Sequence, residues 1–199
     1  MIDVKVKKKF GEFLLSSEMH DSGFVCLTGR NGAGKSSLLN IISGITIPDD
    51  GYVKLNSFDI TRLPIEKRSI ILVTPDSCIP HLEVSEHLVW GAKVKGLHTD
   101  EQFLQNVKRD LGINFESKVK KLSLGMRERV ALATALISKP RAILVDEGFA
   151  NIDDPDRFIP AFRNLSSGID VIFTSQRSED KKFAEHHYVM ESGIARKEF

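Results

Sequence analysis

Apolar positions along the chain follow two kinds of repeat, one typical of strands and one typical of helices. Near the start, Ile2, Val4 and Val6 alternate with polar residues, which predicts a half-exposed strand. Continuous apolar runs predict buried strands of a parallel sheet, and they occupy residues 24–28, 70–73, 142–146 and 171–174. Shorter strands are expected at 13–15 and 52–55.

Helical spacing of apolar side chains separates these strands. It predicts helices at residues 36–43, 84–95, 101–111 and 125–138. Gly44 is expected to end the first helix, and Pro155 to open another after residue 154. Strands that alternate with helices indicate an α/β fold with a largely parallel core sheet.

Composition narrows the class of protein. The chain has 199 residues, of which 41% are hydrophobic and 28% charged, as in an ordinary soluble domain. A net charge of +1 argues against a strongly basic nucleic-acid binder, so we expect no nucleic-acid partner. No apolar run approaches the roughly 18 residues of a membrane span. Cys26 and Cys78 are expected to be reduced, because two cysteines make neither a disulfide framework nor a zinc cluster.

A glycine-rich stretch with a lysine follows the buried strand at 24–28. It reads Gly-Arg-Asn-Gly-Ala-Gly-Lys-Ser over residues 29–36 and fits the pattern G-x-x-x-x-G-K-[ST]. Glycines let the backbone curl so that its N–H groups point at phosphate oxygens, and the helix start adds its positive end. The candidate nucleotide-binding residues are Gly29, Arg30, Asn31, Gly32, Ala33, Gly34, Lys35, Ser36 and Ser37.

Individual side chains of this loop have predicted roles. Lys35 is expected to reach the β- and γ-phosphates of ATP and to assist catalysis, and the Ser36 hydroxyl is expected to ligate Mg²⁺. Asp146 and Glu147 follow the apolar strand at 142–146. Asp146 is the second candidate ligand of Mg²⁺. Glu147 is the candidate base that orients and deprotonates the attacking water.

Between the two motifs, residues 121–130 read Lys-Leu-Ser-Leu-Gly-Met-Arg-Glu-Arg-Val. This stretch resembles the L-S-G-G-Q-R-Q-R-V signature of ABC ATPases, and its place between the phosphate loop and Asp146 is the same as in that family. Ala-Asn-Ile-Asp at 150–153 resembles the family's D-loop, and Phe10 lies where the family has an aromatic side chain that stacks on adenine. The resemblance implies a P-loop NTPase fold of ABC type over residues 1–199. The expected core is about 1–73 and 122–199, with a small antiparallel β region on its N-terminal side, and the helical subdomain is about 74–121.

The resemblance also implies a mechanism and a set of partners. Two such subunits sandwich two ATP molecules, so Ser123 and Gly125 would act on the nucleotide held by the partner's loop, and Asp153 would lie nearby. The closing and opening of the pair would drive a membrane-spanning ABC subunit, from the cytoplasmic face of the cell membrane. The second ATP-binding subunit would be another copy of the chain or a different one. A binding or regulatory module without a membrane partner and with little ATPase activity is the alternative.

A narrower resemblance concerns two stretches after the phosphate loop. Residues 59–68 and 79–86 look like those of importer subunits for molybdate, tungstate, sulfate and similar solutes. Membership of that group would imply a solute-binding protein as a further partner, and other ABC assignments stay open. Those subunits often carry a C-terminal regulatory domain, which we expect to be absent after Phe199. The transported solute and the direction of transport are not predicted.

Several positions depart from the family pattern. Thr74 stands where the family has its Q-loop glutamine, and Ser175 where it has its switch histidine, so the resemblance makes both of them candidate nucleotide-binding residues. Leu124, Met126 and Glu128 depart within the signature. Loss of one transition-state hydrogen-bond donor can lower a rate by roughly 10²–10³. We therefore expect the chain to bind Mg-ATP but to hydrolyse it slowly alone, or to depend on a partner subunit with an unaltered site.

Overall fold

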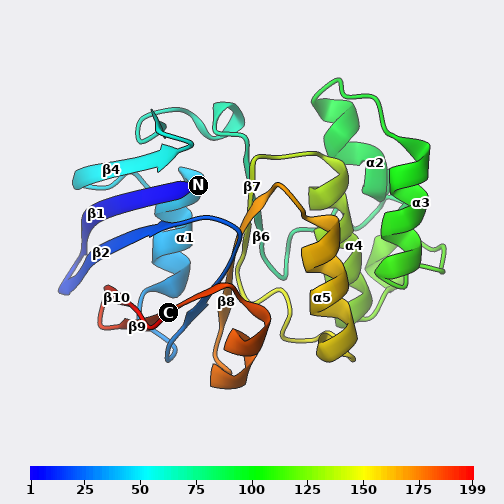
Figure 1. Ribbon diagram of the computed structural model, residues 1–199. Helices are drawn as coiled ribbons and strands as arrows, with labels where there is room; N and C mark the ends of the chain where they lie inside the picture. The colour runs from blue at the N-terminus through cyan, green and yellow to red at the C-terminus, as the bar shows by residue number, and fades with distance from the viewer. The chain divides into compact units, whose positions relative to one another are not determined.

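The computed structural model describes all of residues 1–199, and the chain divides into two units (Figure 1). The first unit comprises residues 1–72, 141–147 and 168–199, and the second comprises 73–140 and 148–167. The second unit is larger than the helical subdomain expected at about 74–121, because it also takes in residues 122–140 and 148–167.

A four-stranded antiparallel sheet lies in the first unit, in the order β2-β1-β4-β5. The strands are β1 (Ile2–Phe10), β2 (Phe13–Asp21), β4 (Asp50–Leu55) and β5 (Phe58–Asp59). The alternation expected in β1 is confirmed, since Ile2, Val4 and Val6 are buried. β2 is longer than expected because Ser17 occupies an inward position, where its hydroxyl donates to the Gly193 carbonyl at 2.8 Å and so breaks the apolar pattern.

The second sheet of this unit has six strands in the order β10-β9-β3-β8-β7-β6. They are β3 (Phe24–Thr28), β6 (Ile70–Val73), β7 (Ala142–Val145), β8 (Asp170–Ser175), β9 (His186–Glu191) and β10 (Ile194–Lys197). β3 is parallel to both β8 and β9, β7 is parallel to β8, and β10 returns antiparallel to β9. All five residues of β3 are buried, as its continuous apolar run predicts. The expected mixed, mostly parallel sheet is confirmed.

One helix, α1 (Lys35–Ser43), completes the core of the first unit. Its buried side chains, Leu38, Leu39, Ile41 and Ile42, belong to the same apolar cluster as residues of both sheets. The helix ends at Gly44, as expected, in the left-handed conformation (φ +93°) that favours glycine.

The buried guanidinium of Arg68 holds the C-terminal end of α1. It follows the short 3₁₀ helix η1 (Ile65–Lys67). Its Nη1 donates to the carbonyls of Ile41 and Ile42 at 3.1 and 3.0 Å. Nη2 and Nε donate to the carbonyls of Thr61 and Leu63 at 2.7 and 2.9 Å. The end of the helix is therefore tied to the segment that follows β5.

Helices make up most of the second unit. They are α2 (Val84–Val94), α3 (Glu101–Asp110), α4 (Leu124–Ile137) and α5 (Pro155–Leu165), with the 3₁₀ helix η2 (Val119–Lys121). α4 packs against α2 and α3, and α3 also packs against α5. Asp154 caps α5 by accepting from the backbone N–H of Arg157, and Pro155 occupies its first turn as expected. None of the helices has the length and apolar character that a membrane span requires.

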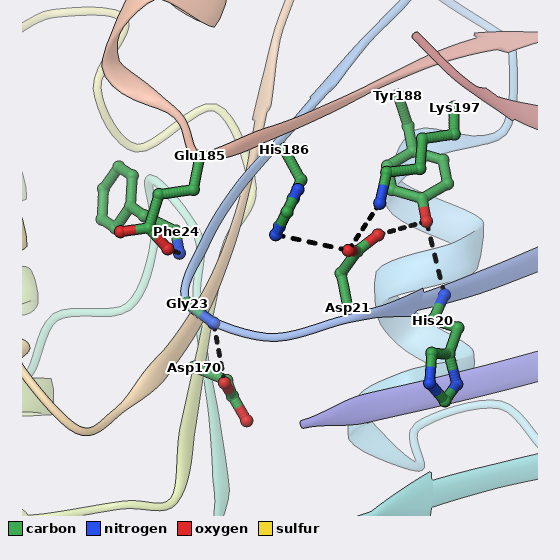
Figure 2. Close-up of polar contacts among 9 residues, drawn as sticks. All are labelled: His20, Asp21, Gly23, Phe24, Asp170, Glu185, His186, Tyr188 and Lys197. Atoms are coloured by element: carbon green, nitrogen blue, oxygen red, sulfur yellow. Dashed lines mark hydrogen bonds and ion pairs between the residues drawn. The ribbon is translucent and has the colours of Figure 1, made fainter. Parts of the chain in front are cut away.

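A polar cluster fixes the connection between β2 and β3 (Figure 2). The Asp21 carboxylate accepts from Lys197 Nζ at 2.7 Å and from the Tyr188 hydroxyl, and lies 3.4 Å from His186 Nε2. Burial and the adjacent Asp21 carboxylate raise the pKa of Tyr188. Asp170 then accepts from the Gly23 backbone N–H at 2.9 Å. These contacts tie the entry of β3 to β8, β9 and β10, and β3 is the strand that leads into the glycine-rich loop.

Candidate nucleotide-binding site

The glycine-rich loop leaves β3 in a conformation that its glycines make possible. Gly32 and Gly34 both have φ in the left-handed region, at +77° and +109°. A Cβ on Gly29 would lie 2.4 Å from the carbonyl oxygen of Met190. A Cβ on Gly34 would lie 3.0 Å from both Met190 Cε and Phe13 Cζ. The glycines at these positions are therefore required by backbone conformation and by close packing.

Lys35 and the turn between β9 and β10 hold the loop in its arch. Lys35 Nζ donates to the carbonyls of Gly29 and Arg30 at 2.8 and 3.2 Å, across the mouth of the loop. Gly193 donates its backbone N–H to the Ala33 carbonyl at 2.8 Å. The N-cap of α1 is Gly34, which offers no side-chain cap to the first backbone N–H groups of the helix. Those N–H groups and the ammonium are donors suited to phosphate oxygens.

A cavity of about 700 Å³ opens over this loop. Its lining consists of loop residues, one aromatic side chain and the β9–β10 turn: Phe13, Gly29–Ala33 and Val189–Ser192. Phe13 and residues 189–192 were not predicted as site residues, because they adjoin the loop only through tertiary contacts. The Phe10 ring lies 6.5 Å from that of Phe13, centroid to centroid, and its contact with adenine stays a prediction.

Asp146 and Glu147 follow β7, which is the direct neighbour of β8 in the sheet. The Thr174 hydroxyl donates to Asp146 Oδ1 at 2.8 Å and accepts from the Glu147 backbone N–H at 2.9 Å. Glu147 has φ +55°, a conformation that costs a non-glycine residue of the order of 1–3 kcal/mol. Such strain persists where surrounding contacts enforce it, and it is concentrated at functional sites. Thr174 thus holds both acidic residues in place at the end of β7, and the role of Glu147 as the base stays a prediction.

Two polar residues at the end of β8, Ser175 and Gln176, make contacts with different partners. The buried Ser175 hydroxyl donates to Asp180 Oδ2 at 2.6 Å and accepts from the Arg177 backbone N–H at 3.0 Å. The next residue, Gln176, donates from Nε2 to Glu147 Oε1 at 2.8 Å. The predicted part of Ser175 in nucleotide binding stays a prediction. Gln176 was not predicted, since no motif marks the position after Ser175.

The signature segment lies in the second unit, where it begins α4. Ser123 is the N-cap of this helix and accepts from the Met126 backbone N–H at 3.3 Å. A Cβ on Gly125 would lie 2.4 Å from the Asn151 carbonyl oxygen, so the D-loop packs directly on this glycine. The buried Glu128 carboxylate accepts from Asn151 N and Nδ2 at 3.2 and 2.7 Å. The signature helix and the D-loop thus form one packed group.

Two further predicted residues belong to the second unit. The Thr74 hydroxyl lies 3.1 Å from Ser77 Oγ, which also accepts from the Thr74 backbone N–H at 2.9 Å. Asp153 is exposed and lies 3.8 Å from the Arg129 guanidinium. For Ser123, Gly125, Thr74 and Asp153, contact with nucleotide stays a prediction.

Comparison with known proteins decides the family. Residues 15–150 match the model of a family described as ABC transporter. The chain belongs to the ABC transporter family. Solved ABC cassettes share its fold: a dimeric bacterial ABC transporter cassette superposes with TM-score 0.84 at 23% identity, covering 100% of this chain and 98% of that one. The ADP conformation of another cassette gives TM-score 0.79 at 23% identity, covering 98% of this chain and 89% of that one.

Curated relatives of this ABC chain are named as import proteins. It is 39% identical over 157 residues to the molybdate/tungstate import ATP-binding protein WtpC of Archaeoglobus fulgidus, covering 76% of this chain and 65% of the relative. It is 34% identical over 206 positions to the molybdenum import ATP-binding protein ModC of Photobacterium profundum, covering 96% and 56%. The chain therefore spans roughly half to two thirds of the length of these relatives.

Proposed function

We propose that this ABC chain binds Mg-ATP and hydrolyses it to ADP and phosphate. The observation that carries the proposal is the arched glycine loop, whose backbone and Lys35 ammonium line and flank a cavity of about 700 Å³. Pockets that hold small ligands and cofactors usually have volumes of roughly 300–1,000 Å³. The carboxylates of Asp146 and Glu147 leave the same sheet of this unit, which provides both a metal ligand and a base.

The donor set suits a magnesium ion. Mg²⁺ prefers oxygen ligands and is usually held by one or two carboxylates together with substrate phosphates. Asp146 supplies a carboxylate that the Thr174 hydroxyl orients, and the exposed Ser36 supplies a hydroxyl on the first turn of α1. When bound, the ion neutralises charge on the phosphates. Lys35 and the loop N–H groups bind the β- and γ-phosphates. Ser37 follows Ser36 in the first turn of α1 and completes the nucleotide-binding segment.

Glu147 takes the proton of the attacking water in this proposal. A positioned general base contributes typically 10²–10⁴-fold to a rate. The backbone of Glu147, which has φ +55°, is anchored at the end of β7 through its N–H to the Thr174 hydroxyl. In this step the water proton passes to the carboxylate, the water oxygen bonds to the γ-phosphorus, and the bond from that phosphorus to the bridging oxygen breaks, so its electron pair leaves with ADP and phosphate is released.

We further propose that ATP turnover drives import of an oxyanion such as molybdate or tungstate. The names of the curated relatives and the match of their residues to 74–96% of this chain support this reading. The partners would be a membrane-spanning ABC subunit, a second ATP-binding subunit and a solute-binding protein, with the chain at the inner face of the membrane.

Mg-ATP titration of the purified chain tests the nucleotide site. Because hydrogen bonds to charged groups contribute roughly 1.5–3 kcal/mol, Lys35→Ala should weaken ATP binding about 10- to 100-fold. Lys93→Ala, an exposed lysine on α2, is the matched control and should bind ATP like the wild type. Equal affinity of the two variants would contradict the assignment of the site.

Uptake of labelled molybdate tests the transport role. Cells whose only copy of the chain carries Lys35→Ala should lose ATP-dependent molybdate or tungstate uptake, while cells with the Lys93→Ala chain should retain it. Normal oxyanion uptake with a chain that no longer binds ATP would argue for the alternative, a regulatory module outside transport.

A further inference from the structure

We propose that Gln176 positions the catalytic carboxylate of Glu147, in place of the neighbouring Ser175. The inference rests on the proposed ATP hydrolysis and names a further residue of that same site. Gln176 directly follows Ser175, which stands where the family has its switch histidine.

Sheet topology brings the two side chains together. β7 and β8 are parallel neighbours, with Val145 paired to Phe173, so Glu147 and Gln176 both lie just beyond the carboxyl ends of adjacent strands. Gln176 Nε2 donates to Glu147 Oε1 at 2.8 Å. The backbone of Glu147 is held independently, because its N–H donates to the Thr174 hydroxyl at 2.9 Å. The backbone of Glu147 is thus anchored from β8 and its carboxylate from the residue that directly follows β8.

The Ser175 hydroxyl makes its hydrogen bonds within the turn that follows β8 and not to Glu147. The hydroxyl is buried, donates its one hydrogen to Asp180 and accepts from the backbone N–H of Arg177. Arg177 in turn pairs with Asp180 at 3.2 Å. A hydroxyl has one hydrogen to donate, so Ser175 cannot donate to Glu147 or to a phosphate while it holds this turn. Ser175 therefore shapes the turn that presents Gln176.

An amide is chemically suited to the positioning task. It donates to one carboxylate oxygen without taking or giving up a proton, so Glu147 keeps its capacity to act as a base. The contact engages Oε1 and leaves Oε2 as the oxygen that accepts the proton of the water. The second N–H of the same amide is not used in this contact and remains a potential donor.

Steady-state ATP hydrolysis tests the role. Loss of one hydrogen bond to a charged group predicts about a tenfold fall in kcat for Gln176→Ala, with KM and the Kd for Mg-ATP within about threefold of wild type. Gln176→His, which keeps a nitrogen donor, should recover part of kcat. Gln102→Ala on α3 removes the same kind of side chain far along the sequence and should hydrolyse ATP like the wild type. Wild-type kcat in Gln176→Ala, or equal losses in kcat and affinity, would overturn the inference.

A spectroscopic readout reports the contact without turnover. The chain has three glutamines, Gln102, Gln105 and Gln176, so selective ¹⁵N-glutamine labelling gives side-chain amide signals that single variants assign. Glu147→Ala should shift the Gln176 amide signals and leave those of Gln102 and Gln105 unchanged. Unmoved Gln176 signals would overturn the proposed contact.

The two readouts separate the two claims. If the wild type hydrolyses ATP and Gln176→Ala is unaffected, the positioning role fails and the proposed function stands. If no turnover occurs in the wild type, even with its partner subunits, while Gln176 still responds to Glu147→Ala, the proposed ATPase function fails, and the catalytic role of Gln176 fails with it.

Discussion

Removal of the Arg68 guanidinium should destabilise the first unit more than any neighbouring surface charge. Arg68 is only 2% exposed, and its hydrogen bonds go to four backbone carbonyls and to no carboxylate. Two of these carbonyls, those of Ile41 and Ile42, lie in the last turns of α1. Arg68→Ala therefore removes the hydrogen bonds that link the end of α1 to the segment after β5.

The magnitude follows from these four bonds. A net contribution of roughly 0.5–1.5 kcal/mol each gives a range of about 2–6 kcal/mol. Burial of the guanidinium lowers the pKa of Arg68, so some of this gain is offset by the cost of burying its charge. We expect a loss of about 3 kcal/mol for Arg68→Ala. In a chain of this length, that loss lowers Tm by about 6–12 °C.

Thermal and urea unfolding check this expectation. Arg62→Ala is the matched control, because Arg62 is exposed six residues earlier, and its loss should change the free energy of unfolding by less than about 0.5 kcal/mol. Arg68→Lys should recover only part of the loss, since a single ammonium cannot reproduce the planar fork of donors. If Arg68→Ala and Arg62→Ala unfold alike, the reasoning about the buried clamp is wrong.

Two other predictions concern the second unit. Gly125→Ala should cost about 1–3 kcal/mol, because the new methyl lies 2.4 Å from the Asn151 carbonyl oxygen; an unchanged Tm would contradict this. Burial lowers the pKa of His87 below 6.5, and its Nε2 accepts from the Ile79 N–H. The unfolded chain then binds the extra proton first, so His87 contributes stability above pH 6.5 that is lost as the pH falls below it. Urea unfolding of His87→Gln between pH 7.5 and 5 should show a smaller pH dependence than the wild type.

Local sequence pattern predicted the parts of the site that are continuous in the chain. The run at 24–28 is a buried strand, and the residues after it form the loop and α1 in the expected order. These features depend on neighbours in sequence: apolar runs, glycines and a lysine at fixed spacing. Asp146 and Glu147 were found for the same reason, since they end an apolar strand.

Contacts between segments that are distant in the chain could not be predicted from such local patterns. Arg68 entered the sequence analysis only as the last residue of the stretch 59–68, and only the packing of that stretch on α1 makes it a buried clamp. Phe13 lines the cavity because β2 passes close to Gly34. Gln176 contacts Glu147 because β7 and β8, which are separated in the chain, are parallel neighbours in the sheet. Their pairing runs from Ala142 with Asp170 to Val145 with Phe173. No spacing within one segment carries this information.

Phosphate release from ATP by the wild type and by Glu147→Gln tests the central claim most directly. The assay uses saturating Mg-ATP and high protein concentration, with Glu66→Gln as the control for an exposed glutamate. Our account predicts measurable turnover by the wild type and the control, and a fall of about 10²–10⁴-fold in Glu147→Gln with unchanged ATP affinity. Hydrolysis by Glu147→Gln at the wild-type rate would contradict it.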